Sequence, residues 1–376
     1  MILRWVLPIV AFLFVAGAGG LLVVLFGIVP IKASGGHWPI TARILEFTMR
    51  RSIATYTLGM DVPPLDERRL VVMGASHYEI GCRPCHGSPE LPRPRITSRM
   101  TPPPPYLPST IVTWQPDELF YIVKHGIKFT GMPAWPAHQR DDEVWAVVAF
   151  LRRFPDLDAA AYREVAGTTD AGSRGGAPIE DLDDPQDVPP AIGESCSQCH
   201  GADGLGRGEG AFPKLAGQRP LYLDASLQAY ARGERHSGIM EPIAAGLDAE
   251  ESRALALYYA RLENASPPVA TRDAARHIEL GARIANRGLP DQLVPACVEC
   301  HGPVARRRNP HYPALAGQYA DYLERQLTLL KEERRGGTAY VHIMRQVAGQ
   351  LTQEQIRAVA LYFASLPWDA SGAQTP

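Results

Sequence analysis

The sequence lacks a large excess of charge of either sign, because 38 Lys and Arg residues face 40 Asp and Glu residues. The formal net charge of -2 excludes an overall basic field for nucleic acid. No Ser-His-Asp arrangement and no catalytic pair of carboxylates stands out. All six cysteines lie in three short motifs, which leaves no thiol for a structural disulfide. With 376 residues, 45% hydrophobic and 21% charged, the chain suits two or three folded domains.

The three motifs are copies of one pattern, C-x-x-C-H, which is the covalent attachment site of a c-type haem. On a helix, positions i, i+3 and i+4 share a face, so two thiols can form thioethers with the porphyrin edge while the His meets the iron. A zinc site would need a second ligand pair, and a redox dithiol would need a βαβ context. Neither accompanies these motifs. We predict three haems c, attached through Cys82, Cys85, Cys196, Cys199, Cys297 and Cys300, with His86, His200 and His301 as axial ligands.

One long stretch, Trp5–Ile31, carries no charged residue, and its 27 residues exceed the roughly 20 that cross a bilayer. A cleavable signal peptide has an apolar region of only about 7–15 residues. The apolar run Leu21–Phe26 continues beyond a possible cleavage site at Ala16–Ala18. We therefore predict an uncleaved transmembrane anchor over residues 1–34. Residues 35–60 are predicted to be a connector resting near the membrane, with a surface-lying amphipathic helix as the alternative.

Residues 61–157 are predicted to be a first helical domain. Helices are expected over Asp66–Ile80 and from Trp114 to His125, the second with acidic residues in its first turn. Between these two helices, four consecutive prolines at 102–105 exclude a helix at their own positions and predict a rigid extended segment along the haem edge. A closing helix is expected over Asp141–Phe154, with core residues at i, i+3, i+4 and i+7. These residues are Val144, Val147, Val148 and Leu151.

Met132 is the predicted distal ligand of this domain. It lies in a loop between a Gly and a Pro, 46 residues after His86. Met often fills gaps in a core, but these neighbours argue against a helical core position. His125 and His138 are competing ligands, which we interpret as surface or satisfied histidines. Trp135 is expected to pack on the haem rather than to act in electron transfer.

The composition changes from Asp158 to Pro190, where eight acidic residues accompany two basic ones and several Gly, Ala and Pro. This composition predicts an acidic flexible linker over 158–190. A docking strip for a basic partner is the alternative interpretation of the same charges.

The remaining chain contains an internal duplication. Phe212–Gln218 matches Tyr312–Gln318 at a separation of 100 residues, too long a period for a solenoid. We predict two related domains, 191–266 and 267–376, each with a haem motif, a Gly-rich loop, a Pro, a helix, a Met loop and a closing helix. The short gap Asn264–Pro268 predicts that the two domains pack together.

Each repeat carries a Met at an aligned position. Met240 and Met344 lie 40 and 43 residues after the His of their motifs, and we predict both as distal ligands. His236 and His342 lie nearby but do not align with each other, which argues against them.

Two prolines also recur, Pro213 and Pro313, which follow the motif His by 13 and 12 residues. A backbone carbonyl there could accept the imidazole N–H, fix the ring orientation and raise the ligand basicity. An ordinary turn proline is the alternative. Arg306–Arg308 forms a basic patch, interpreted as a solvated loop rather than a docking site.

Residues 191–368 resemble the dihaem cytochrome c4 family. The resemblance rests on C-x-x-C-H-G-A-D-G at 196–204, on the repeated F/Y-P-x-L-A-G-Q segments and on the two Met segments. The third motif departs from it, because Gly302-Pro-Val follows its His, but no ligand is changed. Residues 61–157 look like a class I monohaem cytochrome c. The resemblance implies an all-α fold, with three class I cytochrome c domains on an N-terminal transmembrane helix. It also places the haem domains in the periplasm, because thioether attachment is completed outside the bacterial inner membrane.

The whole chain is similar to membrane-anchored multihaem cytochromes c that hand electrons to terminal oxidases. With His and Met on every iron, no coordination position is open, whereas catalytic metal sites keep one open. We therefore predict an electron carrier rather than an enzyme. It would pass single electrons from a quinol-oxidising complex or a soluble cytochrome to a terminal haem-copper oxidase. The alternatives are a cytochrome c subunit of a membrane-bound dehydrogenase, and an enzyme such as a dihaem peroxidase or a thiosulfate-type dehydrogenase, in which one iron lacks its Met.

Overall fold

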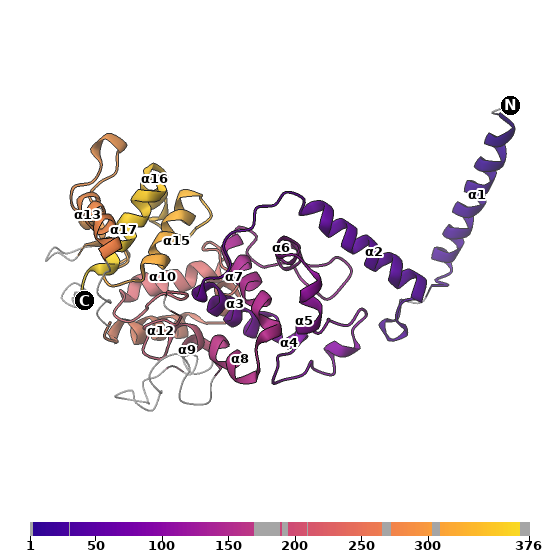
Figure 1. Cartoon of the computed structure of the whole chain (residues 1–376), viewed down its shortest axis with the longest axis horizontal. Helices are drawn as coiled ribbons and strands as arrows, with labels where there is room; N and C mark the ends of the chain where they lie inside the picture. The colour runs from indigo at the N-terminus through magenta and orange to yellow at the C-terminus, as the bar shows by residue number, and fades with distance from the viewer. Residues whose placement is uncertain are drawn as a thin grey trace.

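Helices form the regular structure of this chain. The computed structural model describes residues 3–29, 31–168, 189, 195–208, 210–264, 272–302 and 309–368. Within these residues there are α-helices, short 3₁₀ turns and one isolated bridge between Leu289 and Val294, but no strand. The predicted all-α fold class is confirmed (Figure 1).

The helices group into three units that follow two N-terminal helices. Their bounds are α1 Leu3–Leu25, α2 Pro39–Tyr56, α3 Arg68–Gly81, α4 Arg83–His86, α5 Leu107–Thr110, α6 Pro116–His125, α7 Asp141–Arg153, α8 Ala159–Ala166, α9 Ser197–His200, α10 Pro220–Ala231, α11 Met240–Ala245, α12 Ala249–Arg261, α13 Arg272–Arg287, α14 Val298–His301, α15 Ala320–Lys331, α16 Val341–Gln350 and α17 Gln353–Ser365. We refer to α3–α8 as unit 1, to α9–α12 as unit 2 and to α13–α17 as unit 3.

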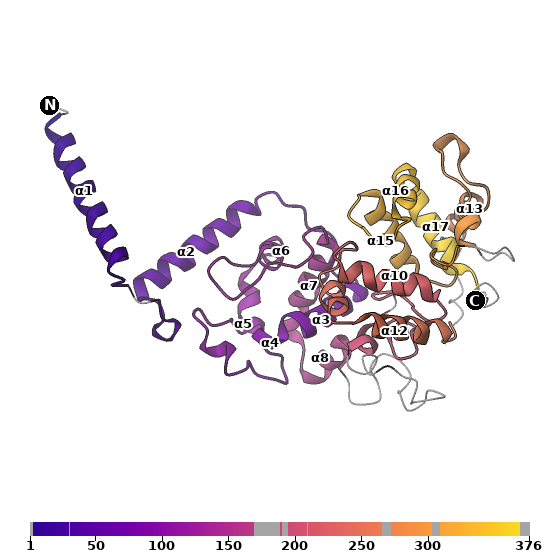
Figure 2. The same cartoon turned by 180° about the vertical axis from the view of Figure 1, so that it is seen from behind.

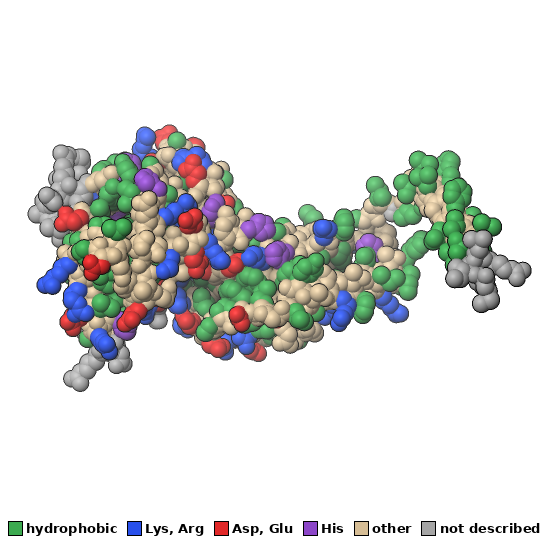
Figure 3. All heavy atoms as spheres, turned by 90° about the horizontal axis from the view of Figure 1, so that it is seen from above, with side chains coloured by type: hydrophobic (Ala, Val, Ile, Leu, Met, Phe, Trp, Pro, Cys, Tyr) green, Lys and Arg blue, Asp and Glu red, His purple; other side chains and the backbone are tan. Residues whose placement is uncertain are grey.

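The N-terminal helix α1 projects from the rest of the molecule, at the end opposite to unit 3 (Figures 1 and 2). Within it, Val6–Leu25 is long and apolar enough to cross a membrane, with 20 residues, a mean hydropathy of 2.5 and none of its surface buried inside the protein. Hydrophobic side chains cover this end, whereas charges of both signs cover the body (Figure 3). The helix is the candidate span expected within residues 1–34.

The connector after α1 forms a second helix, α2, whose C-terminal end packs on unit 1. Ile53 is buried, and Tyr56 stacks on Tyr121 of α6 with ring centroids 5.8 Å apart. The Arg50 guanidinium lies 4.5 Å from the ring centroid of Trp114, a cation–π contact. These contacts tie the anchor to unit 1 rather than leaving it on a free tether.

Unit 1 is organised around the crossing of α3 and α7. The four apolar residues expected on the closing helix are at most 4% exposed. α6 begins with a capping box of Gln115 and Glu118 and ends at Gly126, whose φ of 65° suits glycine. All three predicted helices of this unit are present, with ends within two residues of those expected.

The close crossing of α3 and α7 depends on Gly74, where a Cβ would collide with the backbone oxygen of Ala146. We expect Gly74→Ala to lower the free energy of unfolding by about 1–3 kcal/mol, because added atoms in a packed core force the helices apart. Gly81→Ala, at the end of the same helix, is the matched control, since nothing lies within 4 Å of its Cβ position. Equal denaturant midpoints for the two variants would contradict this role of Gly74.

The predicted flexible linker is wrong for its first part, because Ala159–Ala166 forms α8. Asp158 caps this helix by accepting the Ala161 N–H at 2.8 Å. Tyr162 is 2% exposed, and its hydroxyl donates to the Glu79 carboxylate at 2.6 Å. The acidic composition concealed this short apolar face, which is buried against α3. Residues 169–188 and 190 of the predicted linker, and the Arg306–Arg308 patch, lie outside the described residues.

Units 2 and 3 meet through the repeated F/Y-P-x-L-A-G-Q segments. Gln318 Nε2 donates to the Lys214 carbonyl at 2.9 Å, and Gln318 Oε1 accepts the Lys214 N–H at 3.0 Å. Gln218 makes the corresponding pair with Ala314, at 2.9 and 2.8 Å. Equivalent residues of the two repeats therefore pair across the interface with approximate two-fold symmetry. This contact explains why the two segments match.

Unit 1 packs directly on unit 2. Val72, Met73 and Ala146 share a buried cluster with Cys199 and Phe212. The end of α8 joins this contact, since its last carbonyl, that of Ala166, accepts a hydrogen bond from Gln198 Nε2 at 3.1 Å. Arg207 of unit 2 donates to two further carbonyls of α8, those of Glu164 and Val165. The second haem motif therefore lies against unit 1.

Candidate haem sites

Each C-x-x-C-H motif forms one short helical turn. α4, α9 and α14 each begin immediately after the first Cys and end at the His. The His86 N–H donates to the Cys82 carbonyl at 2.9 Å, and the His301 N–H to the Cys297 carbonyl at the same distance. These bonds place the first Cys and the His of a motif on one face, as expected of residues four apart on a helix.

The three motif histidines are oriented in the same way. Nδ1 lies 3.0 Å from the Pro105 carbonyl oxygen in His86, 3.3 Å from that of Pro213 in His200, and 3.0 Å from that of Pro313 in His301. A carbonyl can only accept, so Nδ1 carries the proton and Nε2 keeps its lone pair for a metal.

Two of the three proline contacts were expected from the repeat. Pro105 was missed, although it ends the four-proline run. Its distance from His86 in the chain, 19 residues, does not match the spacing in the other two units.

The chemistry of the side chains fits a covalently attached haem. Burial lowers the pKa of His86 and of His200, which favours the neutral, metal-binding imidazole. Burial raises the pKa of the Cys82 and Cys199 thiols to about 12 and that of Cys297 to about 11. Across the described ranges, no three His, Cys, Asp or Glu side chains converge as a metal-binding group.

The predicted site residues of units 2 and 3 line one shared cavity. The ligand candidates around it are Cys196, Cys199, His200, Met240, Cys297, Cys300, His301 and Met344. Apolar side chains such as Leu255, Tyr259 and Phe363 complete its walls. The structure thus brings together all eight residues that were predicted to serve these two units.

The three methionines are held differently. Met132 is half-buried in the loop between α6 and α7, where its N–H donates to Thr130 Oγ1 and its carbonyl accepts the Ile127 N–H, both at 3.1 Å. Met240 begins α11, and Met344 lies within α16, so the predicted Met loops of these two units are wrong as to local structure. Both residues still line the shared cavity.

The competing histidines lie away from the shared cavity. His125 and His138 are exposed, with ring centroids 6.4 Å apart. His342 is exposed and its Nδ1 faces the Ala339 carbonyl at 3.1 Å, while the ring of His236 lies 3.7 Å from the Glu241 carboxylate.

Several arginines line the shared cavity, and no sequence pattern pointed to them. Arg235 is 5% exposed. Buried N–H groups of Arg325 (Nη2) and Arg335 (Nε) have no hydrogen-bond partner among the described residues. Although burial raises the pKa of Tyr222, the charges of Arg235 and Arg335 outweigh it and lower that pKa to about 7. Buried N–H groups without a partner need an acceptor. The carboxylates of haem fit this need, and these arginines would hold them.

Unit 1 also contributes to the wall of this cavity, through His77, Arg140 and Glu143. His77 is 5% exposed, and its Nδ1 has no hydrogen-bond partner among the described residues. Sequence analysis missed these residues, because nothing in their local pattern distinguishes them from ordinary helix and loop positions.

Replacing Met132, Met240 or Met344 singly with Ala is expected to change the ferric spectrum and lower the reduction potential of one haem out of three. Met/His ligation raises the potential of haem iron, so the loss of the thioether should reverse that effect. Spectroelectrochemical titration measures both changes. Met100→Ala is the control, because Met100 packs against Gly131 in the Met132 loop but is not a predicted ligand. An unchanged spectrum would show that the replaced Met is not a ligand.

Two family models match separate parts of the chain. The model described as cytochrome c oxidase, cbb3-type, subunit III matches residues 71–151. The cytochrome c model matches residues 191–262 and 278–367. The first match lies within unit 1 and ends before α8, and the second lies in units 2 and 3.

The chain is also similar to known dihaem cytochromes. It is 38% identical over 178 residues to a thiosulfate dehydrogenase electron acceptor of Thiomonas intermedia, covering 47% of this chain and 81% of the relative. It is 32% identical to cytochrome c4 of Azotobacter vinelandii, covering 46% of this chain and 84% of the relative.

Two solved structures are similar to the same portion. The cytochrome c4 structure from Acidithiobacillus ferrooxidans has 33% identity and a TM-score of 0.40, covering 46% of this chain and 98% of that one. Thiosulfate dehydrogenase from Marichromatium purpuratum has 36% identity and a TM-score of 0.41, covering 46% and 36%. With the sequence relatives, the motif geometry and the shared cavity taken together, the chain belongs to the cytochrome c family of electron-transfer proteins, with cytochrome c4-like dihaem homology in its C-terminal half.

Proposed function

We propose that this protein is a periplasmic cytochrome tethered to the bacterial inner membrane that carries three haems c. Electrons from a dehydrogenase of the thiosulfate-oxidising type would enter at units 2 and 3. They would leave through unit 1 to a terminal haem-copper oxidase. The axial pairs would be His86 with Met132, His200 with Met240, and His301 with Met344.

One observation carries this proposal: the two parts of the chain resemble proteins from opposite ends of a respiratory path. Proteins named as electron acceptors of thiosulfate dehydrogenase match 47% of the chain, and we assign this match to units 2 and 3, where the cytochrome c model also matches. Unit 1 matches the model of an oxidase subunit. Because both parts lie on one chain and in contact, electrons taken up by units 2 and 3 can pass to unit 1 without dissociation of one protein from another.

The position of the anchor supports the same direction. Unit 1 follows α1 and α2 in the chain, and α2 packs on it through Ile53 and Tyr56. With α1 in the inner membrane, unit 1 would lie closest to an integral oxidase. Units 2 and 3 would extend toward soluble partners, because they lie at the far end from α1 (Figure 2).

The haem iron supplies the one-electron couple when it is bound, and the chain's residues determine how it is used. A His and a Met held at each iron would leave no open position for a substrate. The proline carbonyls orient the imidazoles, and the buried walls of the cavity limit access of water. His/Met ligation also raises the potential, which suits delivery to an oxidase.

A second candidate is a cytochrome c subunit of a membrane-bound dehydrogenase that does not itself contact an oxidase. The similarity to thiosulfate dehydrogenase electron acceptors supports the same electron donor for this candidate as for the first. The two proposals differ only in the partner of unit 1.

Purification of the full chain from native membranes in mild detergent, followed by reduced-minus-oxidised spectra, tests these proposals. Haem a or b together with copper in the preparation would support an oxidase partner. A dehydrogenase without oxidase cofactors would support the second candidate. The donor is tested separately, by adding thiosulfate and a purified thiosulfate dehydrogenase to the oxidised cytochrome. Failure of the cytochrome to become reduced would contradict the proposed donor.

A further inference from the structure

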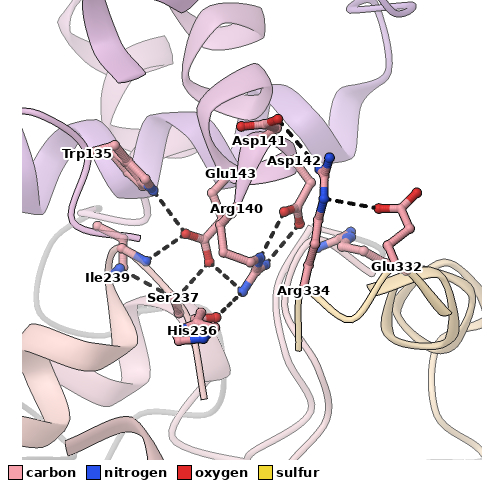
Figure 4. Close-up of polar contacts among 12 residues, drawn as sticks. Trp135, Arg140, Asp141, Asp142, Glu143, His236, Ser237, Ile239, Glu332 and Arg334 are labelled. Carbon is pink, nitrogen blue, oxygen red and sulfur yellow. Dashed lines mark hydrogen bonds and ion pairs between the residues drawn. The ribbon is translucent and has the colours of Figure 1, made fainter. Parts of the chain in front are cut away.

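Unit 1 and unit 2 are joined by a buried carboxylate. Glu143 of α7 is 3% exposed and accepts hydrogen bonds from Ser237 Oγ and from the Gly238 N–H, both at 2.7 Å (Figure 4). It also accepts from Trp135 Nε1 at 3.2 Å. One side chain of unit 1 thus holds the segment of unit 2 that leads into Met240.

Arg140 completes this contact. Its Nη1 lies 2.9 Å from Glu143 Oε1 and donates to the His236 carbonyl at 2.7 Å. Its Nε and Nη2 donate to the two oxygens of Asp142 at 2.8 and 2.9 Å. Every arm of the guanidinium has a partner, and the side chain is buried. Such a network holds the two units in one relative position.

Trp135 lies at the centre of this contact. It is 6% exposed and follows Met132 by three residues. Its indole packs so closely on Gly238 that a Cβ there would collide with the ring. Gly238 precedes Met240 by two residues. One aromatic ring therefore bridges the segments that carry the proposed distal ligands of the first two haems.

His77 extends the aromatic contact toward the other side of the second haem site. Its ring centroid is 5.8 Å from that of Trp135 and 6.4 Å from that of Phe212. Phe212 in turn lies 6.2 Å from His200. Burial, with a smaller effect of the Arg140 charge, lowers the pKa of His77 to about 3, so this ring is neutral. A neutral ring adds no charge beside the haem site.

The contacts between units 1 and 3 are of another kind. They include ion pairs of partly exposed side chains, Arg69 with Asp321 and Arg334 with Asp141, each at 3.5 Å. Arg325 Nη1 also approaches Met73 Sδ at 3.4 Å. No aromatic contact between described residues of units 1 and 3 resembles the one between units 1 and 2.

Against the expectation from the sequence that Trp135 only packs on the haem, we propose that Trp135, supported by His77, is the electron-transfer junction between the first and second haems, so that electrons pass along the linear order third, second, first. This inference rests on the proposed haem ligands but not on the identity of the external partners. In the step, one ferrous iron loses one electron and one ferric iron gains it. No bond is formed or broken, and no proton moves.

Photoinjection into unit 1 of the full chain in detergent tests the junction. A ruthenium photosensitiser is attached to a cysteine introduced by Lys128→Cys, an exposed position in the Met132 loop. Transient absorption follows the electron from the first haem to the others. The wavelengths are those at which the spectra of the Met132, Met240 and Met344 variants show that the absorbance of the three haems differs. We expect Trp135→Leu to slow this transfer several-fold, Trp135→Phe to slow it less, and His77→Leu to slow it to an intermediate degree.

Trp145→Leu is the matched control. Trp145 is another tryptophan of unit 1; it is half-buried and stacks on Phe120 with ring centroids 4.2 Å apart, but it lines the cleft toward unit 3. It should leave the rate unchanged. Slowing by Trp145→Leu without slowing by Trp135→Leu would overturn the proposed order, because electrons would then pass directly between units 1 and 3. Unchanged rates in all variants would overturn the junction itself.

A readout independent of electron transfer shows whether the contact stays closed. Hydrogen exchange of residues 237–241 reports the Gly238 N–H, which donates to Glu143. We expect protection there to persist in Trp135→Phe, so that a slower rate in this variant reflects the bridge and not separation of the units. If Trp135→Leu loses the protection from hydrogen exchange, its slower electron transfer could come from separation of the units. The electron-transfer rates of Trp135→Phe and His77→Leu then test the proposal, and wild-type rates in both variants would overturn it. If the tests with a dehydrogenase or an oxidase fail, these rates of electron transfer within the chain are unaffected. The proposed function and the proposed junction can therefore be contradicted independently.

Discussion

Replacing Cys82 and Cys85 with Ala together is expected to reduce the bound haem from three to two per chain. Both thiols lie on the turn that ends at His86, and no other cysteine of the chain is free to replace them. The same variant should lose most of the stability of unit 1, because a domain of this size buries limited apolar area without its cofactor. Pyridine-haemochrome absorbance per chain, together with intact mass, measures the loss.

The corresponding pair, Cys297→Ala with Cys300→Ala, is the matched comparison. It should also leave two haems, but with unit 1 intact and the shared cavity of units 2 and 3 half empty. If either double variant kept three haems per chain, the assignment of that motif would be wrong. A wild-type ratio of two would show that one motif carries no haem.

Glu143→Ala is expected to have the largest effect on stability of any single replacement at the unit 1–unit 2 contact. It removes the acceptor of three hydrogen bonds and one partner of the buried Arg140. Each buried donor that loses its acceptor costs about 1–3 kcal/mol, whereas Arg140 keeps its two bonds to Asp142. Denaturant unfolding of the full chain, followed by the haem absorbance of units 1 and 2, measures the change in free energy.

Two controls make this result specific. Glu250→Ala removes an exposed carboxylate near the start of α12 and should change stability by no more than about 0.5 kcal/mol. Glu143→Gln keeps one acceptor and the side-chain shape, so its cost should fall between the two. Equal stability of Glu143→Ala and Glu250→Ala would show that the network does not hold the units together.

Local patterns made much of the fold predictable. The helix from Pro116 to His125 begins after a capping box and ends before a glycine. Both signals are local to this segment, so the sequence alone predicts the two ends. The buried face of α7 follows from helical periodicity alone. Where local composition was misleading, the prediction was wrong. α8 was predicted to be linker because its acidic neighbours outweighed a short face, Tyr162 and Ala166, that is buried only by tertiary contacts such as that of Tyr162 with Glu79 of α3.

Some residues of the candidate haem sites were likewise predictable from local sequence, and others were not. The sequence by itself predicted the attachment chemistry, because two Cys and one His at i, i+3 and i+4 need only one turn of helix to act together. It also predicted the proline carbonyls of units 2 and 3, since the repeat displayed them twice. Pro105 has no second copy at the same spacing and was missed.

Only the tertiary structure decided how the three sites are connected. The Gly238 N–H and Glu143 are 95 residues apart in the chain, and His77 meets Phe212 across an even longer separation. Contacts of this range leave no periodic signal in one sequence, because each partner also satisfies the rules of its own helix or loop. The chain's motifs therefore predict which residues bind haem, whereas the packing of unit 1 on unit 2 shows which of the candidate sites are neighbours.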